Sequence, residues 1–251
     1  MNRIPTRIKG FDELIQGGFP EHSIVLLSGS PGTGKSIFGM EYIYKGALHH
    51  GDVSMYVSFE QSPKDLREQA KQLGFSEIER LEQEGTVILS CIPVNEINKD
   101  SVYQIITTAR EAGAKRLVVD SLSALSINAP VYAQSEDMMM HDVVGNNTIL
   151  SPPIIGDDIK KNFIYRFVSD VKAIPTTAIL ISEIPENASR LSSDGVSEFA
   201  ADGVVLLSFE SLGGEFPRSL SIRKMRKTKN NEDTHPFDIT SEGIKIYDLE
   251  V

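Results

Sequence analysis

A glycine-rich segment near the amino terminus constrains this chain more than any other feature. Residues 29–36 read Gly-Ser-Pro-Gly-Thr-Gly-Lys-Ser, which matches the phosphate-loop pattern G-x-x-x-x-G-K-[ST] at every fixed position. An apolar run at 23–28 precedes the segment and a helical pattern at 37–48 follows it, which is the context in which such a loop binds phosphate. The sequence therefore predicts a buried strand, a phosphate-binding loop and a helix, in that order.

The chemistry of the loop follows from its residue types. Glycines let successive backbone N–H groups point inward at phosphate oxygens, and the dipole of the following helix adds positive potential. Lys35 is expected to reach the β- and γ-phosphates of ATP, and the Ser36 hydroxyl is expected to bind Mg²⁺. The residues expected to contact the nucleotide are Ser30, Pro31, Gly32, Thr33, Gly34, Lys35 and Ser36.

Two acidic residues stand at the ends of predicted strands and complete a candidate site. Asp120 ends the apolar strand 116–120, where a carboxylate can hold the Mg²⁺ of a bound nucleotide; capping the next helix is its alternative role. Glu60 closes the strand 53–59, which we expect beside the phosphate-loop strand, and could orient or deprotonate the attacking water. From spacing alone, a solvated charge at a strand end explains Glu60 equally well.

Strand and helix patterns alternate along the first two thirds of the chain. Strands are also predicted at 86–90 and 176–182, and helices at 62–73, 101–112 and 159–173. This alternation predicts an α/β fold with a central, mostly parallel sheet flanked by helices on both faces. The strand patterns near the C-terminus predict an antiparallel extension of the sheet; they lie at 203–209, 218–224, 236–239 and 244–247. We expect a single domain over residues 1–251.

An irregular stretch at about 129–158 interrupts the pattern. It contains several prolines and glycines, and its charged residues are all acidic. Connections of this length are uncommon in compact domains and are usually functional or disordered. We therefore expect a long inserted loop, and we take a partner-binding or regulatory role for it as a hypothesis.

Composition limits the environment and the partners. With 25 basic and 35 acidic residues the net charge is −10, which disfavours non-specific binding to nucleic acid or anionic lipid. No segment approaches the length of an apolar membrane helix, and no secretory signal is visible. The single cysteine, Cys91, cannot form an internal disulfide and fits a reducing compartment. We expect a cytoplasmic protein that does not contact a membrane.

Several motifs together resemble the KaiC-like single-domain ATPases of the RecA/RadA superfamily. They are Ile8–Leu14 with Gly17–Pro20 ahead of the phosphate loop, Phe59–Ser62, Asp120–Leu125 and Lys224–Arg226. The resemblance covers nearly the whole chain outside roughly 130–158. It implies a RecA-like P-loop core in which a turn and a short helix precede the phosphate-loop strand. It also implies ATP hydrolysis with Mg²⁺ in a hexameric ring that carries nucleotide at each subunit interface.

The resemblance also implies roles for individual residues. Glu60 would activate the attacking water, and Lys224 and Arg226 would reach across the interface to the γ-phosphate of the neighbour's ATP, as an arginine finger does. Without the resemblance, a solvated basic turn explains the last two residues. Such sites often carry paired glutamates, whereas this chain has Gln61 at the second position.

One further departure concerns phosphorylation. The circadian clock protein of this superfamily has adjacent phosphorylated Ser and Thr residues where this chain has Glu198 and Phe199. We therefore expect no autophosphorylation at that place, and a clock function is not carried over.

Three functions remain open at this point. The first is a regulatory or signalling ATPase, the second a DNA-recombination ATPase of the RecA/RadA type, and the third a nucleotide-gated scaffold with negligible hydrolysis. The recombinase is disfavoured because the loops that would contact DNA are acidic, with no Lys or Arg between Leu117 and Ile159 and only Arg190 within 183–198. Such loops would repel a phosphate backbone.

Overall fold

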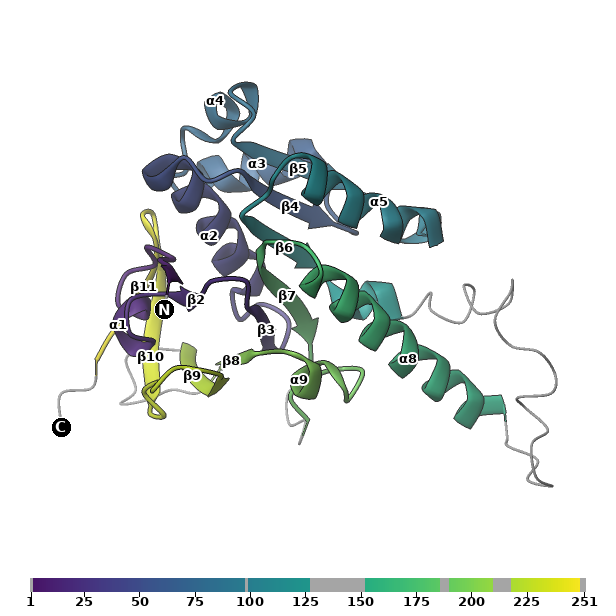
Figure 1. The fold of residues 1–251 in the computed structure, drawn as a ribbon. Helices are drawn as coiled ribbons and strands as arrows, with labels where there is room; N and C mark the ends of the chain where they lie inside the picture. Colours follow the sequence, from purple (N-terminus) through teal and green to yellow (C-terminus); the bar gives the residue numbers. More distant parts are fainter. Residues whose placement is uncertain (1, 98, 127–151, 186–189, 210–217, 249–251) are drawn as a thin grey trace.

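A nine-stranded sheet forms the centre of the computed structural model (Figure 1). The structure describes residues 2–97, 99–126, 152–185, 190–209 and 218–248. The strands of the sheet are β3 (Ile24–Gly29), β4 (Ser54–Ser58), β5 (Val87–Cys91), β6 (Arg116–Asp120), β7 (Thr177–Glu183), β8 (Gly203–Ser208), β9 (Arg218–Met225), β10 (Thr234–Thr240) and β11 (Gly243–Ile246). A separate antiparallel pair is formed by β1 (Arg3–Ile4) and β2 (Phe19–Pro20).

The spatial order of the strands is β11-β10-β9-β8-β3-β7-β6-β4-β5. Every pair from β8 to β5 is parallel, whereas β8–β9, β9–β10 and β10–β11 are antiparallel. The α/β fold with a mostly parallel sheet and an antiparallel C-terminal extension is thereby confirmed.

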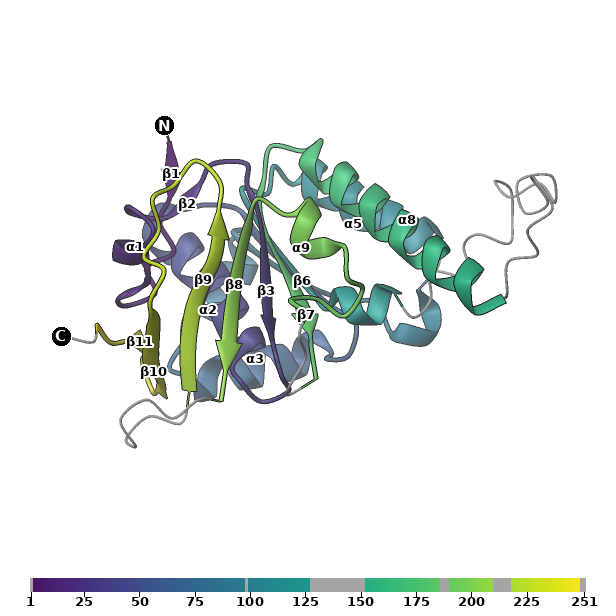
Figure 2. The same cartoon turned by 90° about the horizontal axis from the view of Figure 1, so that it is seen from below.

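Helices cover both faces of the sheet (Figures 1 and 2). One face carries α1 (Phe11–Leu14), α2 (Lys35–His50), α3 (Pro63–Gln72) and α4 (Ile78–Gln83), and the other carries α5 (Lys99–Glu111), α8 (Pro152–Lys172) and α9 (Ser197–Ala200). A short 3₁₀ turn at Val94–Glu96 precedes α5. Because side chains alternate along a strand, β3 sends Val25 and Leu27 into the first core and Ile24 and Leu26 into the second.

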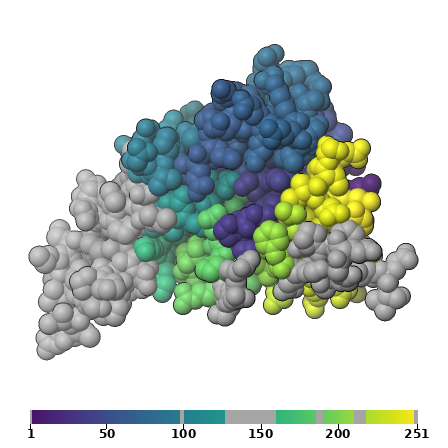
Figure 3. Space-filling view, turned by 180° about the vertical axis from the view of Figure 1, so that it is seen from behind, coloured from purple at the N-terminus to yellow at the C-terminus, as the bar shows by residue number. Residues whose placement is uncertain are grey.

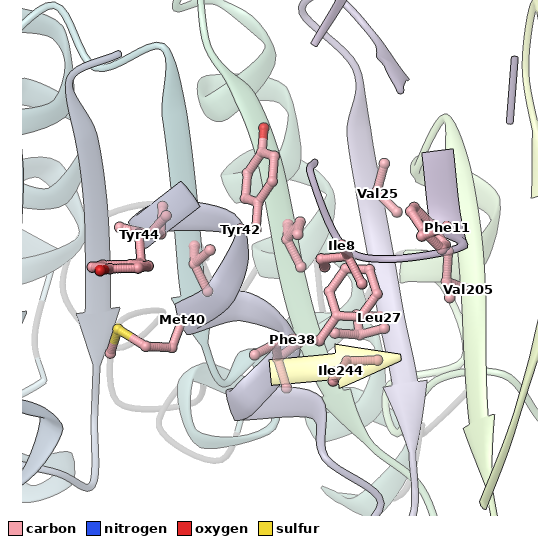
Figure 4. Close-up of a cluster of buried hydrophobic side chains, with 14 of the residues drawn as sticks. Ile8, Phe11, Val25, Leu27, Phe38, Met40, Tyr42, Tyr44, Val205 and Ile244 are labelled. Carbon is pink, nitrogen blue, oxygen red and sulfur yellow. The ribbon is translucent and has the colours of Figure 1, made fainter. Parts of the chain in front are cut away.

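The core beneath α1 and α2 fixes the strand that carries the phosphate loop. Figure 4 shows Phe11, Leu27 and Phe38 packed in this core. The rings of Phe11 and Phe38 meet edge to face, with their centroids 5.1 Å apart. The short helix α1, implied by the resemblance, therefore presses on the first turn of α2 and on β3 together.

The expectation that β4 lies beside the phosphate-loop strand is wrong. β7 and β6 separate β3 from β4. The connecting helix α2 crosses over both of them, since the nearest neighbours of Gly39 are Val118 of β6, Tyr56 of β4 and Ile181 of β7. A Cβ atom at Gly39 would lie 2.9 Å from the Val118 side chain. Local periodicity does not encode the width of such a crossover; the packing of α2 on the sheet sets it.

Helix α8 also begins earlier than the sequence predicts. It runs from Pro152 to Lys172 instead of starting near Ile159. Pro152 and Pro153 interrupt the pattern in sequence, but in the first turn of a helix the missing N–H removes no intrahelical bond. The last part of the expected insertion is therefore helical, and its residues 129–151 lie outside the described part of the chain.

The C-terminal hairpin is tied to α2. Figure 3 shows the C-terminal strands, in yellow, against the purple and blue N-terminal half of the chain. The Glu41 side chain is fully buried, accepts a hydrogen bond from the Ile244 N–H at 2.7 Å and pairs with Lys45 at 2.6 Å. This contact joins β11 to the helix that follows the phosphate loop.

Candidate active site

The predicted phosphate loop connects β3 to α2 at the edge of the sheet where the parallel strands end. Glycine is required at two positions: a Cβ at Gly29 would lie 2.5 Å from the Leu207 backbone oxygen, and Gly34 has a φ of 103°. Gly34 is the N-cap of α2, and among the described residues no side chain caps this helix. The first N–H groups of α2 are therefore available to a phosphate.

The Lys35 side chain contacts the phosphate loop itself. This side chain is buried, and its ammonium group donates a hydrogen bond to the Ser30 carbonyl oxygen at 2.9 Å. Burial lowers the pKa of Lys35, while the charges of Glu183 and Asp120 act against that change. The ammonium group is thus poorly solvated and stands near acidic side chains, where an anionic phosphate would strengthen its charged form.

A buried phenol brings the two predicted metal ligands together. The Tyr56 hydroxyl donates to the Asp120 carboxylate at 2.6 Å and also hydrogen-bonds to the Ser36 side chain. Burial raises the pKa of Tyr56 well above its usual range, so the phenol remains a donor. Ser36 and Asp120 therefore present two oxygens around one hydroxyl group, and oxygen ligands are those that Mg²⁺ prefers. The residues present fit a nucleotide-bound Mg²⁺.

The alternative role of Asp120, capping the next helix, is filled by its neighbour. The Ser121 hydroxyl accepts a hydrogen bond from the Ala124 N–H at 3.4 Å, at the start of the helical turn that follows β6. The carboxylate of Asp120 is therefore not needed to cap that helical turn.

Glu60 lies at the same edge because β4 pairs with β6, which ends in Asp120, and not because β4 pairs with β3. Ser58 pairs with Asp120, and the Phe59 N–H donates to the Asp120 carbonyl oxygen at 3.0 Å. The Ser58 hydroxyl then accepts the N–H groups of Glu60 and Gln61, at 3.2 Å and 2.9 Å, which fixes the turn. Partial burial raises the pKa of Glu60, and the charges of Glu183 and Asp120 raise it further. A raised pKa makes a carboxylate a stronger base near neutral pH.

Glu183 is a site residue that the sequence analysis did not single out. It ends β7 directly opposite Gly29, and its N–H donates to the Ser123 hydroxyl at 3.0 Å. Its charge acts on both Lys35 and Glu60. Its position at the end of a predicted buried strand, which identified Asp120, was the signal that could have found it. We call residues 29–36 with Glu60, Asp120 and Glu183 the phosphate-loop edge.

The side chains of Lys224 and Arg226 lie towards the opposite end of the strands, away from the phosphate loop. Lys224 pairs with Val204, which is level with Leu26, and its ammonium group bonds Ala201, ahead of β8; the phosphate loop follows the carboxyl end of β3. Along β3, at about 3.3 Å per residue, Gly29 lies roughly 17 Å from the level of Arg226 at Ile24 and roughly 10 Å from the level of Lys224 at Leu26. The structure therefore brings Lys35, Ser36, Glu60 and Asp120 together but does not bring Lys224 and Arg226 to them.

Both distant cations have partners within the subunit. The Lys224 ammonium group donates to the carbonyl oxygens of Glu198, Phe199 and Ala201 at 3.1, 3.3 and 2.6 Å. Arg226 pairs with Asp202 at 3.1 Å. We call Lys172, Asp202, Lys224 and Arg226 the cation edge; Figure 2 shows β8, β9 and α9, which surround it.

The structure also bears on the expectations about membranes, metal ions and DNA binding. In the described part of the chain, no helix is long and apolar enough to span a membrane. The described residues also contain no cluster of three or more His, Cys, Asp or Glu side chains placed to hold a metal ion. Most of the first loop that bears on the recombinase alternative, residues 127–151, and residues 186–189 of the second loop lie outside the described ranges.

Known proteins match this chain over almost its whole length. A family model described as "ATPase: KaiC" matches residues 4–149 and 155–251. The UPF0273 protein MJ1359 of Methanocaldococcus jannaschii is 34% identical, covering 98% of this chain and 97% of the relative. A UPF0273 protein of Thermotoga maritima is 29% identical, covering 100% and 98%. The crystal structure of the KaiC-like protein PH0186 from Pyrococcus horikoshii OT3 has a TM-score of 0.79 and 31% identity, covering 98% and 99%.

Proposed function

This chain belongs to the KaiC ATPase family, and from that premise we propose that it hydrolyses ATP as a hexameric ring with a nucleotide at each subunit interface. The observation that carries the proposal is the separation of the two edges. Lys35, Ser36, Glu60 and Asp120 share one edge of the sheet, and the cations that would complete the site lie at the other. A ring brings the second edge of one subunit to the first edge of the next.

Within one subunit the phosphate-loop edge binds the nucleotide and activates the attacking water. The loop N–H groups and Lys35 would bind the phosphates, and Ser36 and Asp120 would hold Mg²⁺. When bound, Mg²⁺ neutralises charge that develops on the β- and γ-phosphate oxygens. Glu60 accepts a proton from the water that attacks the γ-phosphorus, and ADP leaves as the bond to its β-phosphate oxygen breaks. The raised pKa of Glu60, from partial burial and then from Glu183 and Asp120, supports this role over a scaffold without a base.

The neighbouring subunit supplies the remaining positive charge. The backbones of Arg226 and Lys224 are level with Ile24 and Leu26, roughly 17 Å and 10 Å along β3 from the start of the phosphate loop of their own chain. Their side chains act on the neighbour's γ-phosphate, where a cation supplied in trans stabilises charge in the transition state. We further propose that the ring is regulatory, with the acidic insertion at 129–158 as its protein-binding element, because the negative charge of the chain disfavours nucleic acid.

Mixing two inactive variants tests the proposal. Lys35→Ala removes the phosphate ligand, and the double variant Lys224→Ala/Arg226→Ala removes the cations supplied in trans. Each variant alone should hydrolyse ATP very slowly. In an equal mixture, about a quarter of the interfaces would combine an intact phosphate-loop edge with an intact cation edge. Turnover should therefore reappear on mixing.

Light scattering with and without ATP and Mg²⁺ reports whether rings form in the same samples. A wild-type chain that stays monomeric while it hydrolyses ATP at its full rate would exclude the trans role. Failure to regain activity in rings shown to contain both variants would exclude it as well.

A further inference from the structure

We infer that Asp202 is the positioning residue for the trans-acting cations: its carboxylate orients Arg226 and offsets the repulsion between Arg226 and Lys224 at the subunit interface. This inference rests on the proposed function, in which these cations act on the neighbour's nucleotide. Asp202 itself does not touch that nucleotide; it acts through the two side chains.

Asp202 is fixed to the strand that carries the phosphate loop. Its N–H donates to the Ile24 carbonyl oxygen at 2.7 Å, and its Oδ2 accepts the Ile24 N–H at 3.1 Å. Ile24 is the first residue of β3. The carboxylate therefore has a defined place relative to the rigid strand that ends in the phosphate loop of its own subunit.

The second carboxylate oxygen of Asp202 faces cations. Oδ1 accepts from Arg226 at 3.1 Å and from Lys172 at 3.4 Å, and the Arg226 N–H donates to the Asp202 carbonyl oxygen at 2.8 Å. Asp202 thus holds both the backbone and the guanidinium group of Arg226. The Arg226 side chain remains 52% exposed, so N–H groups of its fork can still donate to a phosphate brought by a neighbour.

A β-bulge sets the direction of Lys224. The pairing of β8 with β9 shifts between Val204 and Val205, which leaves Arg223 as an extra residue in β9. Before the bulge, Leu220 and Ile222 point into the core beneath α2. One extra residue reverses the alternation of side chains, so Lys224 points to the other face, where α9 lies, instead of into that core.

The two cations consequently share a small, partly buried region. Lys224 bonds the carbonyl groups at the end of α9, and Arg226 follows two residues later on Asp202. Four charged groups face Lys224, from four elements: Arg226 after β9, Asp202 before β8, Lys172 of α8 and Glu198 of α9. Burial lowers the pKa of Lys224, Arg226 and Lys172 lower it further, and Asp202 and Glu198 raise it. Loss of the Asp202 charge leaves Glu198 as the one acidic group of these four that still offsets the two cations facing Lys224.

The substitution Asp202→Asn separates charge from shape. The amide keeps an oxygen that can accept the Ile24 N–H, but the ion pair with Arg226 is lost. We expect kcat to fall roughly tenfold, as for loss of one charge-assisted hydrogen bond. The KM for ATP should change less than about twofold, because the phosphate-loop edge is untouched. The alkaline limb of the pH–rate profile should move to lower pH, because Lys224 loses its proton more easily.

The matched variant is Lys172→Met, which removes another partner of the same Asp202 oxygen. It takes away a cation that lowers the pKa of Lys224, where burial is the largest cause of lowering, so the alkaline limb should move to higher pH. A merely structural defect would not displace the limb in opposite directions in the two variants.

Mixed rings place the effect on one side of the interface. Asp202→Asn is combined either with Lys35→Ala, in the subunits that donate cations, or with Lys224→Ala/Arg226→Ala, in the subunits that donate the phosphate loop. The recovered turnover should fall further in the first combination. An equal fall in both would mean that Asp202 serves only the fold, and the inference would be wrong.

The inference and the proposed function fail in different ways. If Arg226→Ala lowers kcat but Asp202→Asn keeps the wild-type rate and pH profile, the trans mechanism stands and the positioning role is excluded. If Asp202→Asn increases kcat, the carboxylate holds Arg226 away from the phosphate, and the inference is likewise overturned. If Arg226→Ala itself has no effect, the proposed function fails.

Discussion

The side chains around the two ends of β3 differ in charge. At the phosphate-loop edge Lys35 lies near the carboxylates Glu60, Asp120 and Glu183, and the Arg218 guanidinium group donates to the Gly32 carbonyl oxygen at 3.4 Å. At the cation edge the carboxylates Asp202 and Glu198 lie among the three cations Lys172, Lys224 and Arg226. The same strand holds both groups, because Gly29 begins the phosphate loop and Ile24 bonds Asp202.

The two edges therefore have complementary charges. A bound triphosphate would add negative charge to the phosphate-loop edge, where three carboxylates already stand against Lys35 and Arg218. The cation edge holds three cations, Lys172, Lys224 and Arg226, against the two carboxylates Asp202 and Glu198. In the proposed ring, bringing the edges of two subunits together would compensate both charges.

Glu60→Gln is expected to produce the largest change and tests whether the phosphate-loop edge performs chemistry or only binding. The substitution removes the base but keeps the shape of the side chain. Turnover should fall about 10²-fold or more, as for loss of a general base. ATP affinity, measured with a fluorescent nucleotide, should be retained, since Glu60 has no expected contact with the bound phosphates.

Unchanged turnover in Glu60→Gln would remove this residue from the mechanism. A parallel loss of ATP affinity would instead mean that the substitution disturbs the whole edge. Substituting the adjacent Gln61 by Ala provides the comparison at the same turn, since both N–H groups bond Ser58 through the backbone alone.

Tyr56→Phe should give an intermediate effect on the same edge. It deletes the hydroxyl that joins Asp120 to Ser36 and keeps the buried ring. The Mg²⁺ concentration needed for half-maximal turnover should rise about tenfold, as for the loss of a hydrogen-bond partner behind a metal ligand. The rate at saturating Mg²⁺ should change much less.

Tyr42→Phe is the matched control for the Mg²⁺ titration. Tyr42 is also fully buried, but its hydroxyl donates to the Thr177 carbonyl oxygen at 3.2 Å, at the start of β7 and away from the phosphate loop. Equal effects of the two substitutions on the Mg²⁺ requirement would exclude a specific role for Tyr56.

Local sequence patterns were sufficient for most of this geometry. The strand 116–120 was predicted with its observed bounds, and the position of Asp120 at its end follows from the apolar run before it. The fixed residues of the phosphate loop carry their own conformational requirements, as Gly29 and Gly34 show. Such features depend on neighbours in sequence, which is why they can be read from it.

Features set by distant packing could not be read in the same way. The width of the α2 crossover decides that β6, not β3, brings Glu60 to the site. The bulge at Arg223 turns Lys224 towards α9, and no local pattern marks it. Tyr56 looked like one more apolar strand residue, and its role depends on the hydroxyl meeting Asp120 of the neighbouring strand β6. Glu183 is different, since the rule that identified Asp120 applies to it unchanged.

Glu183→Gln is expected to give the smallest change and tests the charge difference between the edges directly. Glu60 must be deprotonated to accept a proton, so its pKa sets the acid limb of kcat/KM against pH. Partial burial raises that pKa most, and the charge of Glu183 raises it further. Without that charge the pKa falls, the base stays ionised at lower pH, and the acid limb should move to lower pH.

Glu198→Gln is the counterpart at the cation edge and should move the opposite limb. Burial lowers the pKa of Lys224 most, and the charge of Glu198 acts against that change, so its loss should shift the alkaline limb to lower pH. The acid limb should stay in place, because Glu198 lies at the other end of the sheet from Glu60. If either substitution moved both limbs, the edges would not be electrostatically separate, and the division of the site between two subunits would lose its main physical support.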